Sequence, residues 1–174
     1  VHTELMARQL EGSLPFKMLS AMLTNGSILQ WVSNEPDEQN LAAHNETLFE
    51  AIKGFKAMGP KFKAMANAAT LGNLSDQKLE LMKELHLRDH GLDRMGAISV
   101  YMRERYIHAE RWVGAIEIFE PLRIVWAVDD PVANIAIGRE LNERAPQAAY
   151  AELKGVGHFP NAEAPGEIAK QILM

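Results

Sequence analysis

The chain has 174 residues and a mass of 19.4 kDa, which is enough for one domain with a sizeable core and too little for most two-domain proteins. Its composition, 47% apolar and 24% charged, is typical of soluble globular proteins and excludes a disordered or fibrous chain. A net charge of −5 disfavours a nucleic-acid partner, because such binding relies on basic side chains. The absence of cysteine excludes disulfides, thiolate metal sites and a Cys nucleophile.

No membrane span is expected from the sequence. The longest uninterrupted apolar run, residues 124–128, is far shorter than the about 20 residues that a bilayer-spanning helix needs. No signal peptide is visible, so a cytoplasmic location is the default expectation. Residue 1 is Val rather than Met, which leaves the natural start of the gene product open.

Residues 1–33 predict one helix and one strand. Residues 1–11 carry apolar side chains at helical spacing, and Gly12 ends this helix. The apolar run 16–24, closed by an Asn-Gly-Ser turn, predicts a buried strand. A helix that starts at residue 1 with no lead-in indicates that the chain begins within a fold.

Residues 34–114 differ in character from the rest of the chain. Their apolar side chains recur with helical period, their outside is polar, and no stretch resembles a strand. Glycine and proline divide the segment into about four helices. We therefore predict a helical insert.

Residues 115–174 return to alternating strands and helices. The β-branched run 121–128 predicts a strand buried on both faces, and a helix over 132–144 and a second strand over 148–153 follow it. Pro165 is well placed as the first residue of a final helix. This order predicts an α/β fold with a parallel βαβ unit and a right-handed crossover.

Two ionisable residues follow the two predicted strands of this segment. Asp130 comes after the first strand, and His158 lies in the loop after the second. Ligands and catalytic groups gather at the carboxyl ends of parallel strands, so a carboxylate and an imidazole there predict the base half of a nucleophilic triad. The alternative is that Asp130 only caps the next helix and His158 is an ordinary loop residue.

The sequence segments around these two residues resemble the C-terminal segments of the α/β-hydrolase fold superfamily. VWAVDDPV places Asp130 where the superfamily has its acid, with Ala127 where the superfamily usually has Gly. GVGHFPNAEAP matches the superfamily's G-H-x-x-x-x-E-x-P histidine loop, at Gly157, His158, Phe159, Pro160, Glu163 and Pro165. The resemblance covers about the last 55 residues.

The resemblance implies the C-terminal part of an α/β-hydrolase parallel sheet with an inserted helical cap. Residues 1–33 would follow the nucleophile elbow, 34–114 would be the cap, and 115–174 would carry acid and histidine. The chain contains no G-x-S-x-G elbow, and Ser27 is not expected to be a nucleophile. The nucleophile is therefore expected just upstream of Val1, in an N-terminal half of the same fold that would be this chain's partner.

The implied activity is hydrolysis of a small, fairly apolar molecule without metal or organic cofactor. A Ser nucleophile would give ester hydrolysis through an acyl-enzyme, and an Asp nucleophile would give epoxide or haloalkane hydrolysis through an alkyl-enzyme ester. The segments LTNGSIL and RERYIHAERWVGAI look most like the branch of haloalkane dehalogenases, epoxide hydrolases and mesoderm-specific-transcript-like proteins. The alternative is a binding or scaffold protein, or an inactive fragment, that keeps the fold without the chemistry.

Four aromatic side chains are candidates for substrate binding. Tyr101 and Tyr106 would lie in the cap, where epoxide hydrolases resembling this branch carry proton-donating tyrosines, while Trp112 and Phe159 could wall a pocket. For each of them, an ordinary core or surface position is the alternative. The i, i+4 pair of His86 and His90 has a spacing that can bind zinc, but its polar helix-end setting favours plain surface residues.

Overall fold

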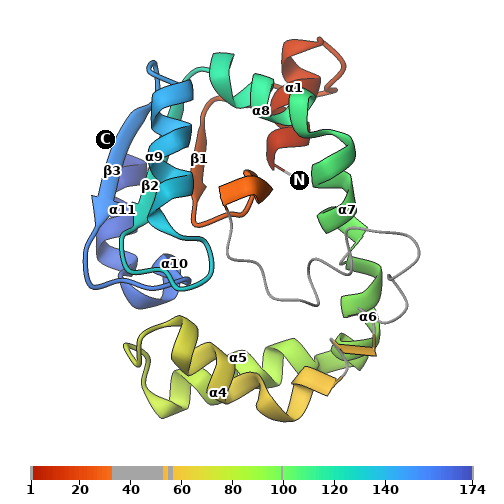
Figure 1. Ribbon diagram of the computed structural model, residues 1–174, viewed down its shortest axis with the longest axis vertical. Helices are drawn as coiled ribbons and strands as arrows, with labels where there is room; N and C mark the ends of the chain where they lie inside the picture. Colours follow the sequence, from red (N-terminus) through yellow and green to blue (C-terminus); the bar gives the residue numbers. More distant parts are fainter. Residues whose placement is uncertain (1, 33–52, 55–56, 99, 174) are drawn as a thin grey trace. The chain divides into compact units, whose positions relative to one another are not determined.

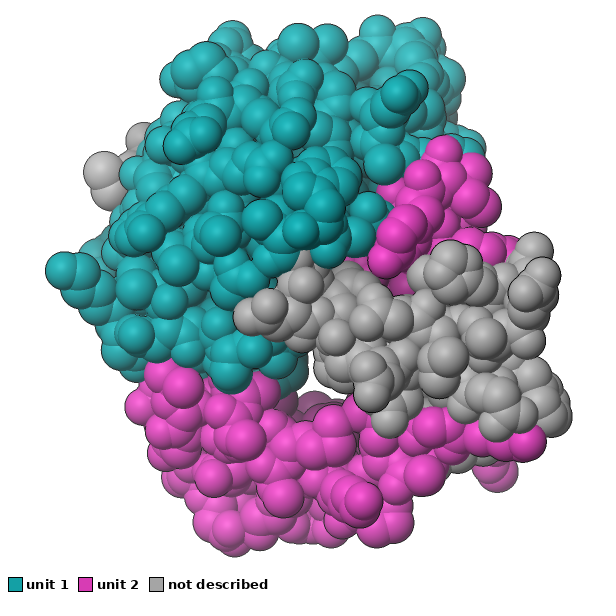
Figure 2. All heavy atoms as spheres, in the orientation of Figure 1, with its two compact units in different colours: residues 1–34, 108–174 teal, residues 35–107 magenta. Residues whose placement is uncertain are grey.

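The computed structural model describes residues 2–32, 53–54, 57–98 and 100–173. It divides the chain into two compact units, residues 1–34 with 108–174, and residues 35–107 (Figure 2). The predicted helical insert ends at residue 114, whereas the second unit ends at residue 107. The difference arises because the helix after residue 108 packs on the first helix of the chain and belongs to the first unit.

The first unit is built on a parallel sheet of three strands in the order β1-β2-β3 (Figure 1). The strands are β1 (Ala21–Thr24), β2 (Leu122–Ala127) and β3 (Ala149–Leu153). Thr24 pairs with Val125, and Ala127 pairs with Leu153. The parallel arrangement brings the carboxyl ends of all three strands to one edge of the sheet, as the sequence predicts for the last two.

Helices of the first unit cover both faces of this sheet (Figure 1). They are α1 (His2–Leu10), the short η1 (Gln30–Val32), α8 (Ala109–Ile118), α9 (Ile135–Arg144), α10 (Pro160–Glu163) and α11 (Pro165–Leu173). Helices α1 and α11 lie close to their predicted positions. Two boundaries differ from the prediction: the first strand is four residues long, and α9 begins three residues later. Helix α10 was not predicted.

Strand β2 is buried on both faces, as its β-branched sequence predicts. On one face Trp126 packs with Ile137 of α9 and Met6 of α1 in the larger core cluster. On the other face Val125 packs with Ile168 of α11 in a smaller cluster. Apolar side chains at alternating positions thus fix β2 between two helical layers, and this holds the turn that follows β2 in place.

Helix α9 approaches the sheet closely at one glycine. A Cβ atom on Gly138 would lie 2.5 Å from the Cγ atom of Trp126, far inside contact distance. Trp126 is 1% exposed, and its indole N–H donates to the backbone oxygen of Ala133 at 2.9 Å. The missing side chain at position 138 therefore lets α9 pack directly on the indole.

The second unit is helical in its described part. Its elements are η2 (Gly59–Lys61), α4 (Phe62–Ala69), α5 (Asp76–Leu87), η3 (Arg88–His90), α6 (Gly91–Ile98) and α7 (Val100–Ile107). Helix α5 begins after Ser75, whose hydroxyl accepts a hydrogen bond from the Lys78 backbone N–H and so caps the helix. Across the described ranges, no helix has both the length and the hydropathy that crossing a bilayer requires.

Candidate active site

Asp130 lies in the turn after β2 with its side chain fully buried. Its Oδ1 accepts hydrogen bonds from the backbone N–H groups of Val132 at 2.7 Å and Ala133 at 3.0 Å. These two bonds hold the carboxylate in the turn ahead of α9. The predicted alternative, in which Asp130 only caps the next helix, does not hold: Asn134 caps α9, and the Asp130 bonds to the turn occupy only one of its two carboxylate oxygens.

The other oxygen faces His158. Oδ2 of Asp130 lies 2.9 Å from Nδ1 of His158, whose side chain is 25% exposed. An ionised carboxylate only accepts hydrogen bonds, so this contact assigns the imidazole proton to Nδ1 and leaves Nε2 with a lone pair. The structure thus brings together the acid and the imidazole that the sequence singled out.

The loop that carries His158 is fixed by two carboxylates. Glu163 of α10 accepts from the backbone N–H groups on either side of the histidine, Gly157 at 2.7 Å and Phe159 at 2.9 Å. Asp129 accepts from the Gly155 N–H at 2.7 Å. Asp129, although exposed, thus ties the end of β2 to the His158 loop.

Asn25, directly after β1, is the residue that the sequence analysis missed. It is 7% exposed, and its Nδ2 donates to Oδ2 of Asp130 at 2.6 Å. The sequence analysis assigned it only a turn. Its place at the carboxyl end of a parallel strand is the signal that could have identified it.

The surroundings of Asp130 act on its pKa in opposite directions. Burial raises the pKa, because it penalises the charged form, whereas hydrogen bonds from His158 and Asn25 lower it. The net result is a pKa below the ordinary value of an aspartate. Asp130 is therefore an anion at neutral pH, as the partner of an imidazole must be to stabilise its protonated form.

Phe159 and Trp112 occupy different parts of the first unit. The Phe159 ring meets the His158 ring edge-on, with 4.9 Å between centroids, so it is the predicted substrate residue that lies beside the acid–histidine pair. Trp112 is 5% exposed on α8, and its indole N–H donates to Glu4 of α1 at 2.7 Å. The structure places Trp112 in the contact between α1 and α8.

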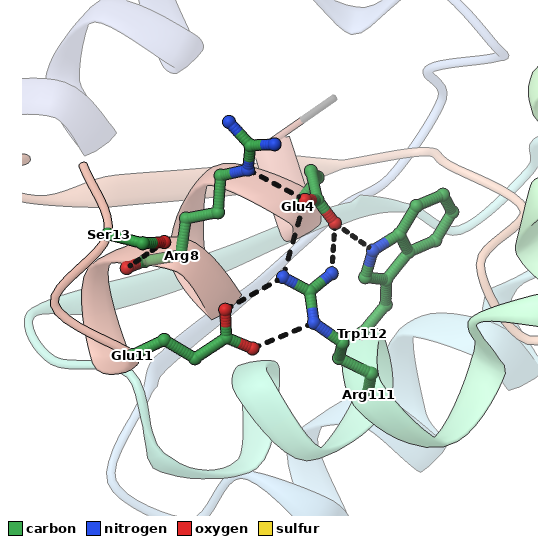
Figure 3. Close-up of polar contacts among 6 residues, drawn as sticks. All are labelled: Glu4, Arg8, Glu11, Ser13, Arg111 and Trp112. Atoms are coloured by element: carbon green, nitrogen blue, oxygen red, sulfur yellow. Dashed lines mark hydrogen bonds and ion pairs between the residues drawn. The ribbon is translucent and has the colours of Figure 1, made fainter.

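Charged side chains complete this contact between α1 and α8 (Figure 3). Arg111 bonds to Glu4 and to Glu11, with 2.8 Å between its Nε and the Glu11 carboxylate, and Arg8 bonds to Glu4 at 2.9 Å. The bonds from Arg111 and Trp112 lower the pKa of Glu4 to about 2. We call Glu4, Arg8, Glu11, Arg111 and Trp112 the α1–α8 cluster.

The remaining predicted residues belong to the second unit. Tyr101 and Tyr106 lie on α7 and are 40% and 43% exposed, and the guanidinium carbon of Arg105 lies 5.4 Å from the Tyr101 ring centroid. The His86 ring stacks on Phe62 with 4.3 Å between centroids. Within the described residues, no group of three or more His, Asp or Glu side chains could hold a metal ion.

A curated protein matches almost the whole chain. "Putative hydrolase LipZ" of Mycobacterium tuberculosis is 36% identical over 175 residues, which cover 99% of this chain and 60% of LipZ. The chain therefore spans less than two thirds of that relative's length. No protein-family model matches it.

Solved structures share its architecture. An α/β hydrolase fold protein from Burkholderia ambifaria is 22% identical, with a TM-score of 0.73, over 98% of this chain and 61% of that protein. A thermophilic esterase from Thermogutta terrifontis is 13% identical, with a TM-score of 0.64, over 88% of this chain and 54% of the esterase. Together with the parallel sheet and its flanking helices, these similarities show that the chain has the α/β-hydrolase fold and represents a C-terminal part of it.

Proposed function

We propose that this chain supplies the acid and the general base of a hydrolase. The observation that carries the proposal is the 2.9 Å contact between a fully buried Asp130 and a partly exposed His158. Burial and backbone bonds fix the carboxylate, while the imidazole keeps one edge open to a reactant. This is the geometry that general-base catalysis requires.

In the proposed reaction, Nε2 of His158 accepts a proton from the attacking group. Asp130 holds the ring with Nδ1 protonated and stabilises the positive charge that the ring then carries. The nucleophile is proposed to come from an N-terminal half of the same fold, outside this chain. With Ser there, His158 activates the hydroxyl; with Asp there, His158 activates the water that hydrolyses the alkyl-enzyme ester.

We propose a small, fairly apolar carboxylic ester as the first substrate class to test. Two observations support this choice: LipZ is named a hydrolase, and the Thermogutta terrifontis protein is named an esterase. Phe159 beside His158 offers an apolar wall to the substrate. Tyr101, Tyr106 and Trp112 remain proposed substrate contacts, and epoxides and haloalkanes remain the alternative substrates.

The experiment is substitution of His158 by Gln in the full-length protein that contains this chain. Turnover of p-nitrophenyl butyrate, styrene oxide and 1-chlorobutane is measured for the wild type and the variant. Loss of a triad base lowers kcat by about a thousandfold or more, and the folded state should persist. His108→Gln is the matched control, because His108 is exposed and lies at the start of α8.

The substrate that the wild type turns over identifies the reaction class. Equal turnover by wild type and His158→Gln would remove His158 from the mechanism and contradict the proposal. A wild-type protein that binds these molecules but converts none of them would favour the non-catalytic binding alternative instead.

A further inference from the structure

Asn25 is buried to an extent that its place in a turn does not explain. Its φ is +41°, in the left-handed region that asparagine tolerates better than most residues. Solvent-facing turn residues commonly adopt this conformation, yet Asn25 is only 7% exposed. The conformation directs the side chain inward from the end of β1.

Both polar atoms of the Asn25 side-chain amide form hydrogen bonds to residues at or after the end of β2. Its Oδ1 accepts a hydrogen bond from the Ala127 N–H at the end of β2 at 3.1 Å, and its Nδ2 donates to Asp130 Oδ2 at 2.6 Å. The first bond fixes the orientation of the amide, since an amide with its oxygen on an N–H must present its NH2 to the other partner. Nδ2 is thereby aimed at the carboxylate.

The oxygen that Asn25 binds is the one that binds His158. Oδ2 of Asp130 accepts from both Asn25 and His158, while Oδ1 accepts from the Val132 and Ala133 backbone N–H groups. With donors on both oxygens, the carboxylate plane is fixed. The direction in which Oδ2 presents itself to the imidazole therefore depends on Asn25.

Neighbouring carboxylates do not share this arrangement. Asp129 and Glu163 bind backbone N–H groups of the loop that carries His158. Asn25, by contrast, contacts the same Asp130 oxygen as the imidazole.

We propose that Asn25 is a positioning residue of the acid–histidine pair: it holds Oδ2 of Asp130 in line with Nδ1 of His158 and shares that oxygen's charge. This inference rests on the proposed function, because it assigns a role within the same site. A role confined to stability would leave the hydrogen bond between His158 and Asp130 unchanged. A positioning role would not.

The test is Asn25→Gly in the full-length protein. Glycine accepts a positive φ without strain, so this change removes the amide and spares the backbone. The matched control is Asn134→Gly. Asn134 also links the two segments of the first unit, because its Nδ2 donates to the Val32 oxygen. Its Oδ1 accepts from the Ala136 N–H, and neither bond involves Asp130.

We expect Asn25→Gly to lower kcat about tenfold and to leave KM within about twofold, because a hydrogen bond to a charged group is lost without any change to the substrate contacts. Without the amide, Oδ2 of Asp130 is no longer held in line with Nδ1 of His158, so the hydrogen bond between them weakens. The Nδ1–H proton resonance of His158, which reports this hydrogen bond, should then move upfield in NMR spectra recorded without substrate. Asn134→Gly should lower thermal stability and leave both readouts at their wild-type values.

An unchanged His158 Nδ1–H resonance in folded Asn25→Gly would overturn the inference, whatever the activity. If His158→Gln shows the proposed function to be wrong, the NMR measurement still tests the positioning role, because it needs no turnover. Equal shifts in Asn25→Gly and Asn134→Gly would also overturn it, since they would reflect a general loosening of the first unit.

Discussion

Asp130 combines burial with four hydrogen-bond donors, two on each carboxylate oxygen. A buried carboxylate without such donors would be neutralised by uptake of a proton, because its charge loses the solvation of water. Here the donors outweigh burial, and the pKa of Asp130 falls below the ordinary value of an aspartate. The ionised form is thus part of the folded structure.

Asp130→Asn should destabilise the full-length protein at pH 7 by about 2 kcal/mol, because the new amide places a donor opposite the donors of Asn25 and His158. A lowered pKa adds stability above 3.8, and this stability is lost as the pH falls through the folded pKa. The difference between wild type and variant should therefore shrink from pH 7 to pH 3, as measured by urea denaturation.

Asp129→Asn is the control for this change. Asp129 has one bond, to the Gly155 N–H, so its loss should cost below about 1 kcal/mol. An equal loss of stability in the two variants would show that the donors around Asp130 have no special weight.

Asp130 and His158 could be predicted because each follows a strand that the sequence marks clearly. Asn25 could not, because an Asn-Gly-Ser tripeptide has the composition of a turn. Its contact to Asp130 joins residues 105 apart, and only the pairing of β1 with β2 brings them together. The predicted strand end places Asn25 at the right edge of a sheet, but the sequence contains no signal for the strand pairing that creates the contact.

At the scale of elements, the first unit depends on how closely α9 approaches β2. The approach occurs at Gly138, where a Cβ would meet the Trp126 ring at 2.5 Å. At Gly114, within α8, an added Cβ atom would meet no neighbouring atom within 4 Å. The two glycines therefore separate the effect of packing from the effect of helix propensity.

Gly138→Ala should lower the free energy of unfolding by about 1–3 kcal/mol, because overpacking outweighs the better helix propensity of alanine. Gly114→Ala should raise it or leave it unchanged. Thermal denaturation of both variants checks the expectation. A Gly138→Ala protein as stable as the wild type would mean that α9 can shift away from Trp126 at little cost.

Element types were predictable and some boundaries were not. The β-branched run of β2 and the Pro165 start of α11 are local signals, and both agree with the structure. The predicted start of α9 was early, because Asn134 rather than Asp130 caps the helix through a bond from the Ala136 N–H. Asp130 and Asn134 are both polar residues that favour a helix cap, so the sequence does not distinguish them. In the structure Asn134 caps α9, and Asp130 contacts His158.

At the scale of the whole molecule, the α1–α8 cluster joins helices that are about 100 residues apart in sequence (Figure 3). Arg111→Met should lower the free energy of unfolding only modestly, because the ion pairs are partly exposed and screened. The pKa of Glu4 is lowered from 4.5 to about 2, so the stability it adds is present above pH 4.5 and is lost towards pH 2.

Thermal unfolding at pH 7 and pH 2.5 measures this contribution. The loss of stability on acidification should be smaller in Arg111→Met than in the wild type. Arg139→Met is the control. Arg139 of α9 pairs with Glu152 of β3, the next element in the chain, so this ion pair does not join distant helices. If both variants behaved alike, the cluster would have no more weight than an ordinary surface pair.

The insertion of residues 35–107 between β1 and β2 has a consequence for how the fold can vary. Asn25 and Asp130 flank the insertion point, and their contact is made entirely within the first unit. The entropy lost on closing a flexible loop grows only with the logarithm of its length, by about 0.6 kcal/mol per doubling. An insert of different length or sequence could therefore replace residues 35–107 while the acid–histidine pair kept its geometry, so chains sharing this first unit are free to diverge in the insert.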